Sequence, residues 1–341
     1  MKTLMPGIVG NEALKERLAP MLSSGSLSHA YIIEGPAGIG KKTFARHFAA
    51  AAACEHGDGD TVPCGKCRSC RMILSGICPD VTFVGPEGKA SIGVDRIREI
   101  CADVHIYPND LDYRIYVIDG ADTMTPQAQN AFLLTLEEPP KYVLFLLLCE
   151  NSGRLLETVR SRAPRFRMQP LSREDVGKVV AAEMPEAEKI RRNDPERFGA
   201  AVMSSGGAAG RAMQLLGGKD GNADLARRRT AVGFLELASA RGKGAEASLL
   251  LMKNAGTREE ISALLDTVIA ASRDLILINR DENAPLLFFP DREKAAALSE
   301  SFPIRRLLSI SYAASDAKEA VSRGMNIRLT VTDMLAKSGI I

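Results

Sequence analysis

The 341-residue sequence lacks any apolar segment long enough to cross a lipid bilayer. Its most apolar run is YVLFLLL at 142–148, whereas a membrane-spanning helix needs about 20 such residues. The N-terminal residues MKTLMPGIVGNEALKERL also lack the apolar core of a secretory signal peptide, and they continue into a charged helical pattern. These absences argue against a membrane protein and predict a cytoplasmic location.

Neither sign of charge is in excess. The 44 Lys and Arg residues nearly balance the 42 Asp and Glu residues, which leaves a formal net charge of +2. Nucleic-acid binding is therefore not indicated by the total charge, although a local basic face is compatible with it. With 45% hydrophobic and 25% charged residues, the chain is an ordinary globular protein, and disordered and fibrous classes are excluded. The length allows two or three domains.

Seven cysteines in a cytoplasmic protein are expected to be thiols or metal ligands instead of disulfides, and their odd number agrees with this. Four of them follow the spacing C-x9-C-x2-C-x2-C: Cys54, Cys64, Cys67 and Cys70. Four thiolates complete a tetrahedral Zn²⁺ shell, so we expect a structural zinc module. His56 and Cys78 are alternatives to Cys54 that break the spacing, whereas Cys101 and Cys149 lie on apolar patterns typical of buried thiols.

Strand and helix patterns alternate along the first half of the chain. Apolar runs predict strands at 29–35, 80–84, 114–119, 142–150 and 165–168, and helical periodicity predicts helices at 11–24, 43–53, 94–104 and 125–137. This alternation is typical of an α/β domain with a parallel sheet that is buried on both faces. After about residue 170 only helical patterns remain, interrupted by two loose stretches at 204–210 and 217–222.

A glycine-rich loop, GPAGIGKKT at 35–43, follows the first of these apolar strands and precedes a helix. Gly35, Gly38 and Gly40 permit backbone N–H groups to surround phosphate oxygens, and Lys41 would reach the terminal phosphates. The phosphate-loop pattern then requires a hydroxyl that binds Mg²⁺, but Lys42 occupies that position. Thr43 offers a hydroxyl one position late.

The strand RIYVID ends in Asp119 and resembles a Walker B strand, whose carboxylate holds Mg²⁺. In working ATPases of this kind a glutamate follows, but this chain has Gly120. Asp122 would lie on the same face if the strand continued, and its short side chain is a poor substitute. An ion pair between Lys42 and Asp119 is expected to take the place of the metal. Whether the degenerate loop binds ATP and Mg²⁺ stays open.

Arginines gather just after the strand at 142–150. Arg160, Arg162 and Arg165 lie within TVRSRAPRF, and Arg211 lies early in a predicted helix. Arginines at a domain edge are most often solvated surface charge, so their role depends on the protein family.

Taken in order, these motifs resemble the bacterial clamp-loader AAA+ family of DNA polymerase III, and its delta-prime branch most closely. The resemblance covers nearly the whole chain and rests on IVGNEALKERL, SHAYIIEGPAGIGKKT, the cysteine insert, MTPQAQNAFLLTLEEPP and the SRA tripeptide at 161–163. TLEEPP together with the cysteine insert is the most specific part.

The resemblance implies a RecA-like AAA+ domain at 1–169 with a zinc insert at about 54–78, a helical lid at 170–220 and a helical collar at 221–341. In this family the collar joins five subunits into a ring. The implied partners are gamma/tau and delta subunits, and indirectly the sliding clamp and primed DNA, without a membrane.

The resemblance also implies that Arg162 acts as an arginine finger in the nucleotide site of a neighbouring subunit. Ser161 and Arg162 match the Ser-Arg-Cys motif of the family, whereas Ala163 departs from it. Arg211 resembles the sensor arginine of the lid, which is a weaker match. The implied role is a stator subunit without ATP hydrolysis of its own.

Two other functions are weighed against this one. A gamma/tau-type ATPase motor shares the fold, the zinc module and the arginine motif, but Lys42, Gly120 and the absence of a long tail argue against it. A sequence-specific DNA-binding zinc protein is the weaker alternative, because only Lys66, Arg68 and Arg71 lie near the four cysteines.

Overall fold

The computed structural model describes residues 3–56, 61–86, 91–240, 242–254, 256–281 and 284–341. The chain divides into two compact units, of which the first comprises Met1–Asp175 with Ala208–Gly210 and the second comprises Val176–Gly207 with Arg211–Ile341. The predicted insert at about 54–78 includes residues 57–60, which lie outside the described residues.

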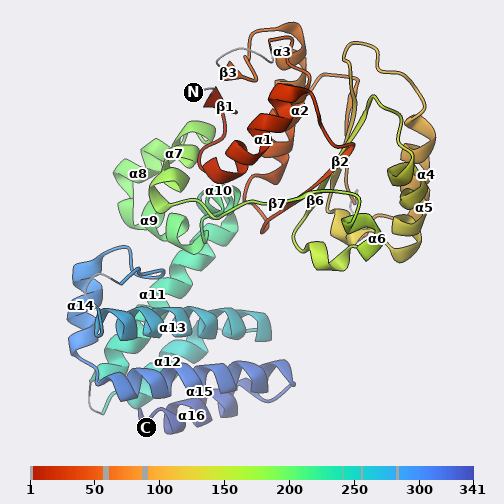
Figure 1. Cartoon of the computed structure of the whole chain (residues 1–341). Helices are drawn as coiled ribbons and strands as arrows, with labels where there is room; N and C mark the ends of the chain where they lie inside the picture. The colour runs from red at the N-terminus through yellow and green to blue at the C-terminus, as the bar shows by residue number, and fades with distance from the viewer. Residues whose placement is uncertain (1–2, 57–60, 87–90, 241, 255, 282–283) are drawn as a thin grey trace. The chain divides into compact units, whose positions relative to one another are not determined.

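A five-stranded parallel sheet forms the centre of the first unit, with the strand order β4-β5-β6-β2-β7 (Figure 1). Its strands are β2 (Ala30–Glu34), β4 (Val81–Val84), β5 (Arg114–Asp119), β6 (Val143–Cys149) and β7 (Arg165–Arg167). Each lies within or next to a predicted strand. The sequence-based prediction of an α/β domain with a parallel sheet is therefore confirmed.

Helices cover both faces of this sheet. They are α1 (Glu12–Ser24), α2 (Lys41–Ala52), α3 (Arg68–Leu74), α4 (Val94–Asp103), α5 (Pro126–Glu137) and α6 (Glu157–Arg160), with short 3-10 turns η1 (Ala121–Thr123) and η2 (Ser152–Arg154). Figure 1 shows α1 and α2 on one face and α4 and α5 on the other. A small parallel pair, β1 (Thr3–Leu4) with β3 (Thr61–Val62), completes the unit.

Alternate residues of each strand enter different cores. Tyr31 and Ile33 of β2 pack with the side chains of α1 and α2, whereas Ile32 packs with those of α4 and α5. All seven residues of β6 are buried. Burial of both faces explains why these strands read as nearly continuous apolar runs instead of alternating ones.

In the described part of the second unit every regular element is a helix. The helices are α7 (Arg173–Glu183), which begins at the end of the first unit, α8 (Ala187–Asn193), α9 (Pro195–Ser204), α10 (Ala209–Gly217), α11 (Lys219–Ser239), α12 (Gly244–Lys253), α13 (Arg258–Ile278), α14 (Arg292–Glu300), α15 (Ile304–Ser322) and α16 (Ile327–Lys337). The stretch at 217–222 was expected to be loose, but only Gly218 separates α10 from α11.

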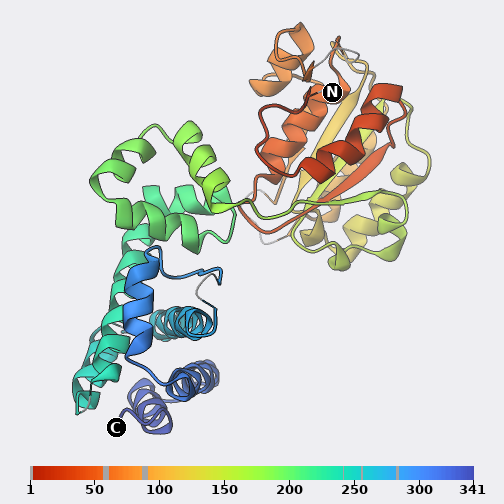
Figure 2. The ribbon, with the colours of Figure 1, turned by 60° about the vertical axis from the view of Figure 1, so that its left-hand side comes forward.

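The long helices α13 and α15 pack side by side, and Figure 2 shows them nearly end-on. Their shared core contains Leu265, Val268, Leu307 and Ile310, all fully buried or nearly so. The predicted boundary between residues 220 and 221 falls inside α11, so the division into lid and collar stays a prediction. Among the described residues, no helix is both long and apolar enough to cross a membrane.

A buried carboxylate fixes the loop between α4 and β5. Asp80 is fully buried and accepts N–H groups from Asn109, Asp110 and Leu111, and its Oδ1 lies 3.2 Å from Nη1 of Arg114. Burial by itself raises the pKa of Asp80, but these donors outweigh it and hold the pKa below its ordinary value. The carboxylate therefore stays ionised in the folded protein.

We expect Asp80→Ala to lower the free energy of unfolding by about 3–5 kcal/mol at neutral pH, because the largely buried Arg114 loses one of its two carboxylate partners and three N–H groups lose an acceptor. Since the pKa is lowered on folding, this contribution is present above the ordinary pKa of an aspartate and is lost as the pH falls through the lowered value. Denaturant unfolding checks this, with the exposed Asp112→Ala as the matched control. Equal stability of the two variants would contradict the assignment.

Candidate functional site

The glycine-rich loop lies between β2 and α2, as the sequence predicts. Gly38 and Gly40 have φ angles of 72° and 100°, a conformation that side chains with a Cβ rarely adopt. Gly40 is the N-cap of α2. The loop therefore ends at a helix N-terminus, where backbone N–H groups and the helix dipole favour an anion.

Lys41, the predicted phosphate-binding lysine, is directed at the loop itself. Its Nζ donates to the carbonyl oxygens of Gly35 at 2.6 Å and Pro36 at 3.0 Å. These bonds close the loop around the ammonium group. The lysine thus stabilises the loop through contacts within the chain.

Lys42 forms the ion pair that the sequence predicts. Its Nζ lies 2.9 Å from Oδ2 of Asp119, and the two side chains are 63% and 26% exposed. A pair this exposed contributes only about 0–1 kcal/mol to stability. Its importance is chemical, because it places a positive charge beside the carboxylate that the sequence analysis predicts as a Mg²⁺ ligand.

The backbone after Asp119 differs from the sequence-based expectation. β5 ends at Asp119, and Gly120 has a φ of 73° and caps the 3-10 turn η1. The expectation that Asp122 lies further along the same strand face is therefore wrong. Asp122 is 8% exposed and its Oδ2 accepts the N–H of Asn151 at 3.1 Å, so it serves to join the ends of β5 and β6.

A second polar cluster at this edge of the sheet was not predicted. Glu34, the last residue of β2, accepts a hydrogen bond from Ser152 at 2.5 Å and lies 3.6 Å from Nη1 of Arg165. It lines a cavity of about 470 Å³ together with Asn151 and Arg154. Part of the signal was present, since Glu34 ends one apolar strand and Asn151 and Ser152 follow another. The sequence does not show that these strands are neighbours, nor that Arg165 at the start of β7 lies beside them.

Arg162 lies just after α6, and two elements hold its guanidinium group. Nη1 donates to the carbonyl oxygen of Thr158 at 2.8 Å, and Nη2 contacts Oε1 of Glu137 at 2.6 Å. Ala163, where the family motif has cysteine, is 3% exposed. The departure from the motif therefore lies in the core, while the arginine side chain remains partly exposed.

Arg211, the predicted sensor arginine, lies near the start of α10 in the second unit and is exposed. Its role stays a prediction. Thr43 is exposed on the first turn of α2.

The four predicted zinc ligands come together. The sulfur atoms of Cys54, Cys64, Cys67 and Cys70 all lie within 4.8 Å of one another, and those of Cys64 and Cys70 are 3.9 Å apart. Four sulfurs about 2.3 Å from a tetrahedral zinc ion lie at about this mutual distance. His56 and Cys78 are not part of this group, so among the described residues the cluster could hold a metal ion with the predicted ligands alone.

Backbone N–H groups support thiolates in this cluster. The backbone N–H groups of Lys66 and Cys67 donate to the sulfur of Cys64, with nitrogen–sulfur distances of 3.5 and 3.4 Å. These two bonds, of which that from Cys67 has the larger effect, lower the pKa of Cys64 to about 6. Cys67 is also the N-cap of α3 and accepts the N–H of Cys70. Burial instead raises the pKa values of Cys54 and Cys70. Because metal ligands must be deprotonated, a cation that binds this cluster would have to displace protons from these two thiols.

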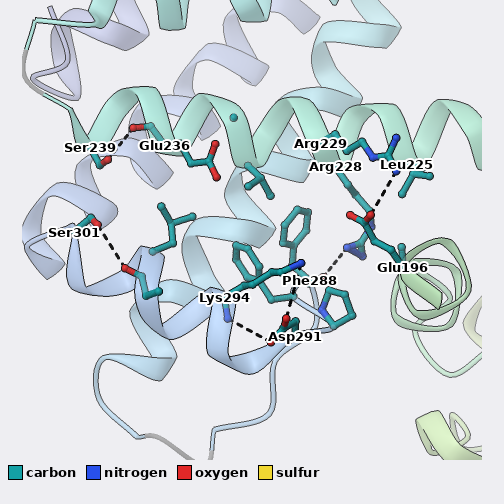
Figure 3. Close-up of a pocket in the computed structure, with 17 residues that line it drawn as sticks. Glu196, Leu225, Arg228, Arg229, Glu236, Ser239, Phe288, Asp291, Lys294 and Ser301 are labelled. Carbon is teal, nitrogen blue, oxygen red and sulfur yellow. Dashed lines mark hydrogen bonds and ion pairs between the residues drawn. The ribbon is translucent and has the colours of Figure 1, made fainter. Parts of the chain in front are cut away.

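A further cavity, of about 730 Å³, lies wholly in the second unit between α11, α14 and the segment at 288–291 (Figure 3). Two arginines in its lining have partners close by. Arg229 lies 3.4 Å from Glu196, and Nη1 of Arg228 donates to the carbonyl oxygen of Phe288 at 2.6 Å. None of the predicted site residues lines this cavity.

Comparisons with known proteins match the first unit best. Residues 10–172 match the family described as DNA polymerase III, delta subunit. The tau subunit of Bacillus subtilis DNA polymerase III is 34% identical over 186 residues, which are 53% of this chain and 32% of tau. The gamma subunit of Buchnera aphidicola from Schizaphis graminum is 34% identical over 169 residues, 50% of this chain and 46% of gamma.

The chain thus spans a third to about a half of the length of these relatives. A solved structure, a DNA polymerase III gamma subunit-related protein from Thermotoga maritima, aligns over 95% of this chain and 97% of that chain at 20% identity, with a TM-score of 0.39. The chain carries a DNA polymerase III delta-subunit-like domain whose homologues are named tau and gamma.

We expect the purified chain to contain one zinc ion per molecule and the Cys67→Ser variant to contain less than half of that, because a closed thiolate shell tolerates no missing ligand. Inductively coupled plasma mass spectrometry measures the metal. The matched control is Cys101→Ser, which changes a thiol outside the cluster. Full zinc content in the Cys67 variant would show that the cluster is not the metal site.

Proposed function

We propose that this chain is a clamp-loader subunit of DNA polymerase III of the delta-prime type, a stator that assembles with motor subunits and does not hydrolyse ATP. The observation that carries this proposal is the Lys42–Asp119 ion pair, 2.9 Å long, in the place where an ATPase holds Mg²⁺.

The argument rests on the electrostatic demands of phosphoryl transfer. The metal neutralises charge that develops on the phosphates, and it needs a hydroxyl and a carboxylate as anchors. Lys42 removes the hydroxyl and its ammonium group competes with the metal for Asp119. Gly120 removes the glutamate that would polarise water, and its φ of 73° makes a side chain at that position strained.

In this proposal the catalytic contribution of the chain is made in trans. Arg162 would stabilise charge on the phosphoryl group of ATP bound to an adjacent gamma/tau subunit. The residue is suited to this because its side chain is 32% exposed, unlike the neighbouring core residue Ala163. An arginine supplied in this way contributes about 10³–10⁵ in rate in other systems.

The helices after residue 221 would form the collar of a five-membered ring with gamma/tau and delta subunits. Several large apolar side chains on them are exposed, including Leu249 at 67%, Tyr312 at 70% and Leu329 at 70%. Side chains of this kind support assembly with other subunits. The structural zinc ion, the lid at 170–220, the sensor role of Arg211 and the action on the sliding clamp and primed DNA belong to the same proposal.

A gamma/tau-type ATPase motor is the second candidate, because the curated relatives carry the names tau and gamma. The comparisons do not separate the two branches. The two candidates differ in whether the chain hydrolyses ATP, which depends on the residues at positions 42 and 120. An ATPase assay can therefore distinguish them.

We expect no multiple turnover of ATP by the isolated chain with Mg²⁺, because both the metal anchor and the catalytic glutamate are missing. A coupled-enzyme assay for released ADP measures this, with the Lys41→Ala variant as the control for a contaminating ATPase. Sustained hydrolysis that disappears in the Lys41 variant would favour the motor.

We expect Arg162→Ala to lower the DNA-stimulated ATPase rate of the loader reconstituted with gamma/tau and delta subunits by about a third or more, since the one site that it serves loses most of a 10³–10⁵ contribution. Arg160→Ala is the matched control, because Arg160 is an exposed arginine on the same short helix. Gel filtration confirms that both variants assemble. An unchanged rate for Arg162→Ala would refute the trans role.

A further inference from the structure

The guanidinium group of Arg162 is held by contacts from two sides. The carbonyl oxygen of Thr158 accepts from Nη1 at 2.8 Å, and Oε1 of Glu137 accepts from Nη2 at 2.6 Å. Thr158 belongs to α6 and Glu137 is the last residue of α5, so the two contacts come from separate helices. Because a guanidinium group has five N–H donors, others remain available for a ligand.

Glu137 is placed where a carboxylate is otherwise unfavourable. The C-terminus of a helix carries partial negative charge, and α5 has no basic residue in its last turn. A glutamate at this position therefore needs an outside cation. Arg162 is that cation, although it lies 25 residues further along the chain.

Helix α5, which ends at Glu137, is joined by hydrogen bonds to the segment that leads into α6. Gln129, a buried residue of α5, donates to the carbonyl oxygens of Met124 and Arg154 and accepts the N–H of Leu156 at 2.7 Å. The helix that presents Glu137 and the short helix before Arg162 are thus fixed to each other. The position of the guanidinium group is set by the fold.

Resting on the proposed function, we infer that Glu137 is a positioning residue for the trans-acting Arg162. It holds the guanidinium group ordered before a neighbouring subunit presents its nucleotide. A free arginine side chain has several rotatable bonds, and ordering it at the moment of reaction would oppose catalysis. The ion pair is 32% exposed on the arginine side and 45% on the glutamate side, so it orders the group without burying it.

The chain offers a matched control next to this residue. Glu138 has the same side chain and charge and also lies at the end of α5 as its C-cap, but the guanidinium contact is made by Glu137. Glu137→Ala and Glu138→Ala therefore change the net charge equally. Only the first removes the contact to Arg162.

The test uses the loader reconstituted with gamma/tau and delta subunits and primed DNA, in single-turnover ATP hydrolysis. We expect Glu137→Ala to lower the rate constant for ATP hydrolysis at the served site by about 3- to 10-fold. This range corresponds to the part of the entropy cost of ordering the arginine side chain that one contact offsets. The KM for ATP and the assembly of the ring should not change. Glu138→Ala should stay close to wild type, and Glu137→Gln should fall between wild type and Glu137→Ala.

The double variant Glu137→Ala, Arg162→Ala separates positioning from other effects. If Glu137 acts through the arginine, the double variant has the rate of Arg162→Ala alone. A further loss in the double variant, or a Glu137→Ala rate equal to that of Glu138→Ala while Arg162→Ala is slow, would overturn the inference and leave the proposed function intact. An unchanged rate for Arg162→Ala itself would instead refute the proposed function.

Discussion

Parallel pairing of β5, β6, β2 and β7 is the constraint on which the rest of the first unit depends. In this register Asp119 is paired with Leu148, and Glu34 is paired with both Cys149 and Arg167. Because all strands run in the same direction, their carboxyl ends meet at one edge. The loop after β2 and Asp119 are thereby neighbours, although 76 residues separate Lys42 from its ion-pair partner in the numbering of the chain.

The register is set by burial and not by the polar residues at the edge. A shift of one residue would exchange the two faces of every strand, and both faces here pack against helices through different cores. The polar edge residues can therefore change with little effect on the fold. This separation explains how the sheet retains its shape while its edge carries Lys42 and Gly120.

The secondary-structure elements with a strong hydrophobic pattern were predicted correctly from the sequence. The prediction failed for very short elements and for stretches judged from a few local residues. β5 was predicted with its observed bounds, because its four apolar residues at 115–118 are flanked by the charged Arg114 and Asp119. The pair β1 and β3 was missed, since two-residue strands have no periodicity. The stretch at 217–222 was expected to be loose for its glycines, yet α11 begins at Lys219, so the weak local preference of the glycines does not decide the structure there.

The same division applies to the candidate site. The cysteine cluster and the Lys42–Asp119 pair followed from spacing and charge, whereas Asp122 was misplaced because the left-handed conformation of Gly120 cannot be read from an isolated glycine. The contact of Arg162 with Glu137 depends on how α5 ends beside α6. Long-range contacts of this kind require the fold, and no local pattern encodes them.

The positive charges of the two loop lysines are engaged by partners in or beside the loop, whereas that of the arginine after α6 stays partly exposed. Lys41 and Lys42 are engaged with acceptors of their own chain, the carbonyl oxygens of the loop and the carboxylate of Asp119. These contacts supply inside the loop the charge balance that a bound metal and phosphate supply in an ATPase. Arg162 is instead held near the surface by partners that leave part of its guanidinium group accessible. In the proposed function, the loop of this chain therefore lacks the groups needed for turnover, and Arg162 is the cation that acts on a neighbouring subunit.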